Sequence, residues 1–78
     1  MHKSTEIEPV YLALGGKIRY IRDVLGIDQK ELSKRTRLTR TSITNIETGR
    51  QRCSLHVLEG ISRGLGTTPK GLMKGIWF

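Results

Sequence analysis

The side chains with the clearest binding chemistry are basic, and they are concentrated in the middle of the chain. The sequence has 14 Lys and Arg residues against 7 Asp and Glu residues, which gives a net charge of +7. The window 30–52 carries +5 of this charge, because only Glu31 and Glu47 oppose its basic residues, Lys30, Lys34, Arg35, Arg37, Arg40, Arg50 and Arg52. Such an excess favours a polyanionic partner, either a nucleic acid or an anionic membrane surface.

Residues that could support catalysis or metal binding are few. Cys53 is the only cysteine, so no internal disulfide can form, and with His2 and His56 it does not make up a zinc-ligand set. The sequence has no paired carboxylates and no Ser/His/Asp or Cys/His arrangement that can be placed in one pocket. We therefore expect no enzymatic activity, no metal and no cofactor. We expect Cys53 to be an inert loop thiol, with redox sensing as the alternative.

The length of the chain limits its organisation. Its 78 residues, of which 36% are hydrophobic, suffice for one domain with one small core. Residues 1–9 are polar and of mixed charge, so we expect a flexible N-terminal arm followed by a single domain over 10–78. Because no secretory signal precedes the domain and no apolar run approaches the ~20 residues of a membrane span, we expect a cytoplasmic protein.

Apolar residues recur at three- and four-residue spacing, as in Leu14, Ile18 and Ile21, which is typical of amphipathic helices. No alternating strand pattern occurs, so the predicted class is all-α. Gly15 and Gly16 should weaken the first helix by up to ~1 kcal/mol each relative to alanine. Capping residues indicate where the later helices begin: Asp28, Thr39, Ser54 and Thr68. The predicted helices cover about 10–25, 29–35, 40–48 and 55–65, with a short last helix from Pro69 onward.

Residues 28–49 have the layout of helix, tight turn and helix, in which the second helix can lie in the major groove of DNA while the first braces it. The runs GIDQKELS (26–33) and LTRTSITNIETG (38–49) resemble the Cro/C1-type (XRE-like) helix-turn-helix family, which includes lambdoid phage repressors, restriction–modification controller proteins and antitoxins. The resemblance covers about residues 14–72 and implies a compact five-helix lambda-repressor-like domain. Arg37 stands where the family favours a small residue in the turn, and Cys53 stands where a proline is common. Arginine tolerates a positive φ far less well than glycine.

The resemblance also implies roles for individual residues, in three groups. Side chains on the outward face of the second helix would contact base edges: Arg40, Thr41, Thr44 and Asn45. Other side chains would hold the DNA backbone: Gln29, Thr48, Arg50 and Arg52. Arg22 and Glu47 would form a structural ion pair between the first and third helices.

The function implied is that of a sequence-specific transcriptional regulator, which binds a roughly palindromic double-stranded DNA operator as a homodimer. We expect the dimer interface in the C-terminal segment, at Ile76, Trp77 and Phe78, because aromatic residues are enriched in interface cores. The alternative is an antitoxin of the same fold that neutralises a toxin and represses its own operon; contact with a toxin or with RNA polymerase stays open. A membrane partner is disfavoured, because the basic residues are spread over several short helices rather than one long amphipathic one.

Overall fold

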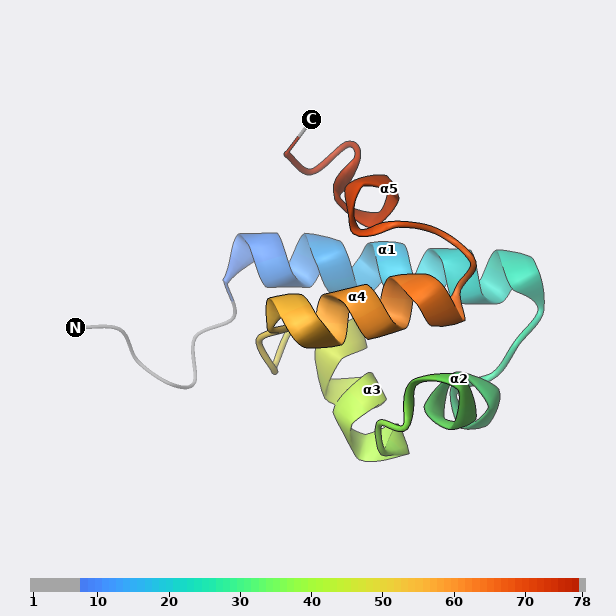
Figure 1. The fold of residues 1–78 in the computed structure, drawn as a ribbon. Helices are drawn as coiled ribbons and strands as arrows, with labels where there is room; N and C mark the ends of the chain where they lie inside the picture. Colours follow the sequence, from blue (N-terminus) through green and yellow to red (C-terminus); the bar gives the residue numbers. More distant parts are fainter. Residues whose placement is uncertain (1–7, 78) are drawn as a thin grey trace.

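The computed structural model describes residues 8–77, and it contains five α-helices and no strand within that range (Figure 1). The helices are α1 (Pro9–Leu25), α2 (Gln29–Thr36), α3 (Arg40–Glu47), α4 (Leu55–Gly64) and α5 (Pro69–Met73). The predicted all-α class and the order of the five helices are confirmed. The predicted boundaries differ by about one residue; α1 begins at Pro9 because proline is well suited to the first helical position.

Side-chain caps determine where four of these helices begin. The backbone N–H groups of Glu31 and Ser42 donate to the side chains of Asp28 and Thr39, over 2.8 and 3.0 Å. Ser54 and Thr68 cap α4 and α5 in the same way. All four predicted caps are therefore formed, and each satisfies a backbone donor that a helix end otherwise leaves without a partner.

One apolar core joins the helices. α1 packs against α3 and α5, while α2 packs against α3 and α4. Each helix contributes at least one almost completely buried side chain: Leu14 and Ile18 from α1, Leu32 from α2, Ile43 and Ile46 from α3, Leu58 and Ile61 from α4, and Leu72 and Met73 from α5. The core therefore holds α3 by its inner face only, and its outer face stays exposed.

The backbones of α1 and α3 meet at Gly15. A Cβ atom on Gly15 would lie 2.2 Å from the carbonyl oxygen of Ile46 and 2.6 Å from that of Glu47. A Cβ atom on the neighbouring Gly16 would meet nothing within 4 Å. The two glycines are thus not equivalent, and α1 is continuous through both of them.

We predict that Gly15→Ala destabilises the fold by ~1–3 kcal/mol, because the added methyl group would force the backbones of two helices apart. Gly16→Ala is the matched control. It should stabilise the protein by up to ~1 kcal/mol, since alanine favours a helix and the position has free space. Urea denaturation of both variants measures the difference, and equal effects would show that Gly15 is not a contact point.

The turn between α2 and α3 contains a left-handed arginine. Arg37 has φ 61° and ψ 17°, and it is the one non-glycine residue with a positive φ among residues 8–77. Its backbone N–H donates to the carbonyl oxygen of Ser33 over 2.8 Å, and Leu38 N–H donates to Thr36 Oγ1 over 3.3 Å. The turn therefore keeps the conformation expected of a small residue, and hydrogen bonds offset a backbone cost of ~1–2 kcal/mol.

No helix in the described range is long and apolar enough to cross a membrane.

Candidate nucleic-acid interface

The outward face of α3 brings together four side chains to which the family resemblance assigns base contacts. Arg40, Thr41, Thr44 and Asn45 line an open hollow of about 400 Å³. Ile43 and Ile46 lie on the opposite face of the helix, where they are almost completely buried. The helical spacing thus places Ile43 and Ile46, together with the buried Glu47, on the inner side of α3 and these four polar residues on its outer side.

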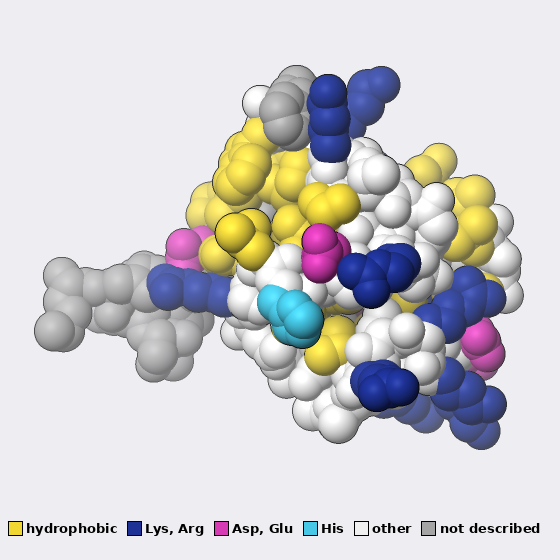
Figure 2. All heavy atoms as spheres, in the orientation of Figure 1, with side chains coloured by type: hydrophobic (Ala, Val, Ile, Leu, Met, Phe, Trp, Pro, Cys, Tyr) yellow, Lys and Arg dark blue, Asp and Glu magenta, His cyan; other side chains and the backbone are white. Residues whose placement is uncertain are grey.

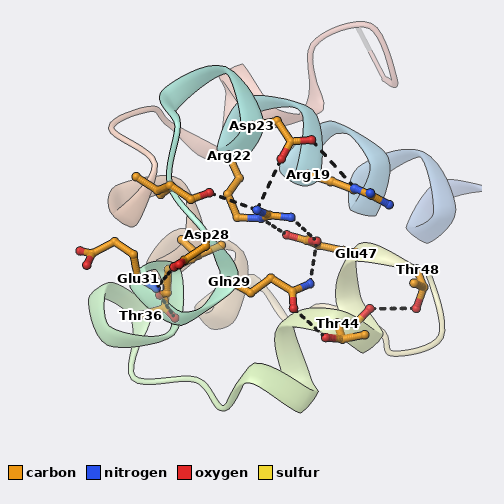
Figure 3. Close-up of polar contacts among 12 residues, drawn as sticks. Arg19, Arg22, Asp23, Asp28, Gln29, Glu31, Thr36, Thr44, Glu47 and Thr48 are labelled. Atoms are coloured by element: carbon orange, nitrogen blue, oxygen red, sulfur yellow. Dashed lines mark hydrogen bonds and ion pairs between the residues drawn. The ribbon is translucent and has the colours of Figure 1, made fainter.

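A buried ion pair fixes α3 to α1. Arg22 Nε lies 2.8 Å from Glu47 Oε2, and Arg22 Nη2 donates to Glu47 Oε1 over 3.1 Å. A third donor, Arg22 Nη1, bonds the carbonyl oxygen of Ile27 over 3.1 Å. Hydrogen bonding to Glu47 raises the pKa of Arg22 above its ordinary value. The two side chains are only 11% and 3% exposed, so the pair expected from the sequence is formed inside the protein (Figure 3).

Gln29 lies between this pair and the outward face of α3. Its Nε2 donates to Glu47 Oε1 over 3.1 Å, and its Oε1 accepts a hydrogen bond from Thr44 Oγ1 over 3.1 Å (Figure 3). The family resemblance assigns Gln29 to a phosphate contact. In this structure one amide hydrogen is used within the protein, which leaves the second for such a contact. The bond to Thr44 was not expected from the sequence.

The other residues assigned to the DNA backbone differ in their surroundings. Thr48 Oγ1 lies 2.9 Å from the carbonyl oxygen of Thr44, so its hydroxyl already has an acceptor. Arg52 is paired with Glu8, with 2.6 Å between Arg52 Nε and Glu8 Oε1. Arg50 is exposed. No sequence signal indicates the pairing with Glu8, because the two residues are 44 positions apart.

Basic side chains lie on several parts of the molecular surface, and one group of them surrounds α2. Figure 2 shows Lys and Arg side chains grouped around α2, at the lower right. All seven basic residues of the 30–52 window are exposed. Two of them have intramolecular partners: Arg52 is paired with Glu8, and Arg35 Nε lies 2.9 Å from Glu31 Oε2. The surface is therefore cationic, but two of its seven basic side chains are already paired with carboxylates of the same protein.

Cys53 lies in the core beside this surface, at 8% exposure. Burial raises the pKa of its thiol to about 11. At neutral pH the thiol is therefore protonated and a poor nucleophile, as an inert thiol would be. Within residues 8–77 no group of three or more His, Cys, Asp or Glu residues could hold a metal ion.

Known proteins of similar sequence and structure match most of the chain. A family described as "Helix-turn-helix domain" matches residues 13–72. The control protein C.BamHI of Bacillus amyloliquefaciens is 38% identical over 65 residues, which cover 82% of this chain and 80% of that protein. The clp gene regulator ClgR of C. glutamicum has 26% identity and a TM-score of 0.81, covering 86% of this chain and 88% of that one. The restriction–modification controller protein C.Esp1396I has 25% identity and a TM-score of 0.80, covering 87% and 88% of the respective chains.

Proposed function

The chain belongs to the Cro/C1-type (XRE-like) helix-turn-helix family of DNA-binding transcriptional regulators, which are not enzymes, and we propose that it regulates transcription by binding a specific, roughly palindromic operator as a homodimer. One observation carries the proposal. The polar face of α3 presents Arg40, Thr41, Thr44 and Asn45 in one open hollow, within a cationic surface. Two of the similar proteins are themselves named control or controller proteins, which supports the regulatory role.

In this proposal α3 lies in the major groove and α2 braces it across the DNA backbone. Arg40, at the first position of α3, can bind guanine O6 and N7 bidentately, and Asn45 can bind adenine N6 and N7. Gln29, Arg50 and Arg52 hold phosphates, Arg52 after it exchanges Glu8 for a phosphate oxygen. Base edges then determine the sequence that is bound, and phosphate contacts supply most of the affinity.

Arg40→Ala tests the assignment of the reading face. We expect it to reduce the preference for the selected operator over random duplex by about 1–3 kcal/mol, because a bidentate base contact is lost. Arg50→Ala is the control, because Arg50 is exposed whereas Arg52 is already paired with Glu8. The Arg50→Ala variant should bind all sequences more weakly by about the same factor. Fluorescence anisotropy on an operator selected from a random duplex pool measures both. Equal losses on operator and random DNA for Arg40→Ala would instead make Arg40 a phosphate contact.

The proposed dimer rests on exposed apolar side chains near the C-terminal end. Trp77 is 69% exposed, and Figure 2 shows apolar side chains grouped toward the first half of α1 and the C-terminal segment. Ile76 differs from Trp77, because it packs half-buried against the core of its own chain. Phe78 lies outside the described residues. We therefore assign the proposed dimer interface to Trp77. Ile76 is better explained as part of the core of its own subunit.

We predict that Trp77→Ala shifts the protein toward monomer while the domain stays folded. Sedimentation equilibrium at tens of micromolar measures the assembly, and operator binding should weaken in parallel because two half-sites need two linked subunits. Leu55→Ala is the matched control, since Leu55 is 82% exposed but begins α4. A wild-type monomer under these conditions, or a Trp77→Ala variant as dimeric as the wild type, would contradict the assignment.

The antitoxin alternative has no observation in its favour and stays an untested prediction. Co-purification of the chain with the product of a neighbouring gene would test it.

A further inference from the structure

A chain of hydrogen bonds runs from the buried ion pair to the outward face of α3. Glu47 accepts from Arg22 inside the protein and also accepts from Gln29, whose carbonyl oxygen in turn accepts from Thr44. Thr44 is exposed and lines the hollow on α3. This series of hydrogen bonds therefore ends at the Thr44 hydroxyl group, which lies in the proposed base-reading surface (Figure 3).

The direction of every bond in this chain is determined at its buried end. Both oxygens of the Glu47 carboxylate accept hydrogen bonds from the Arg22 guanidinium, and a carboxylate has no hydrogen of its own to donate. Gln29 must therefore turn its NH₂ group toward Glu47, which turns its carbonyl oxygen toward Thr44. A carbonyl oxygen also only accepts, so the Thr44 hydroxyl must be the donor.

A threonine hydroxyl has one hydrogen and two acceptor lone pairs. With the hydrogen bound to Gln29 Oε1 at 3.1 Å, Thr44 Oγ1 offers only lone pairs to the hollow. A free threonine has no such restriction, because its hydroxyl rotates to donate or to accept. Thr41 lies on the same exposed face and takes no part in the hydrogen bonds that join Glu47, Gln29 and Thr44.

We propose that Gln29 is a positioning residue that makes Thr44 an acceptor-only reader, so that Thr44 selects a base with an exocyclic amino group. In the major groove this group is N6 of adenine or N4 of cytosine, whereas guanine and thymine present acceptors there. The inference rests on the proposed function, since it requires α3 to lie in the major groove. The second amide hydrogen of Gln29 stays free for a phosphate, so positioning and phosphate binding are compatible.

Selection from a random duplex pool, followed by sequencing of the bound DNA, tests the inference with the full chain. The operator position read by Thr44 is the one whose base frequencies change in Thr44→Val. At that position the wild-type protein should prefer adenine and cytosine over guanine and thymine by about fivefold, the low end of discrimination by a base contact. Gln29→Met should remove this preference, because the freed hydroxyl can donate or accept, and it should leave the other positions unchanged.

Two further variants keep the test decisive. Thr44→Ser retains the hydroxyl without the methyl group, so it should keep the preference for amino bases; its loss would show that the methyl group reads the DNA. Thr41→Val should leave the position read by Thr44 unchanged. A wild-type preference for guanine or thymine there, or a Gln29→Met variant that folds and keeps the wild-type preference, would overturn the inference while the proposed function stands. Failure of the wild-type protein to select any sequence would overturn the proposed function, and the inference with it.

Discussion

Raising the salt concentration from about 50 to 200 mM is expected to weaken operator binding by about 10³–10⁵-fold, the loss typical of a protein that contacts ~6–10 phosphates. The physical reason is the release of counterions from DNA when cationic side chains replace them. A dimer presents two copies of the exposed basic surface around α2 and α3, so this number of contacts is reasonable. Titrations at several salt concentrations should give a slope of log K against log [salt] of about −5 to −9.

Two variants change the slope in opposite directions. Arg50→Ala should make it shallower by about 1 for each bound subunit, because one phosphate contact is lost. Glu8→Gln should make it steeper, because Arg52 no longer has a carboxylate partner within the protein. A nearly flat plot for the wild-type protein would contradict DNA binding through this surface.

Glu47→Gln is expected to destabilise the fold by about 3–5 kcal/mol, because it removes the buried carboxylate that faces the Arg22 guanidinium and leaves only the exposed Asp23, whose carboxylate lies 3.4 Å from Nη1. The Glu47 side chain is 3% exposed and accepts three hydrogen bonds, from Arg22 Nε, Arg22 Nη2 and Gln29 Nε2. In a domain of this size, each kcal/mol lowers the melting temperature by about 4–8 °C. A decrease of more than ~10 °C in a thermal melt is therefore the expected result.

Glu31→Gln is the matched control for this prediction. Glu31 also pairs with an arginine, Arg35, but the two side chains are 44% and 42% exposed, so the loss should be within about 0–1 kcal/mol. If Glu47→Gln melted like the wild type but lost DNA binding, Glu47 would be a functional residue rather than a structural one.

The sequence predicts the features of this fold that depend on neighbouring residues. Capping by Asp28, Thr39 and Ser54 takes place within three residues of each side chain, so a short pattern suffices to locate the helix starts. The outward face of α3 follows in the same way, because Ile43 and Ile46 define the buried side and thereby the exposed one.

Other features depend on contacts between distant parts of the chain, which local patterns do not encode. The pairing of Arg52 with Glu8 joins residues 44 positions apart and occupies a side chain that we assign to a phosphate contact. The bond between Gln29 and Thr44 spans 15 positions and becomes evident only when α2 and α3 are placed together. Gly15 resembles Gly16 in sequence, and only the approach of α3 distinguishes them. Local sequence patterns therefore identify the residues of the proposed DNA-binding surface. Contacts between distant parts of the chain determine which hydrogen-bond partners those side chains already have.

The contact at Gly15 has a consequence for how this protein can change during evolution. Because main-chain atoms of α1 and α3 meet there directly, the distance between the two helices does not depend on the size of an intervening side chain. Mutations that alter the volume of core residues such as Ile18 or Leu58 should then change stability more than they change the distance between α1 and α3. The placement of α3 on its operator would vary little through such drift, so stability and sequence preference can evolve largely as separate traits.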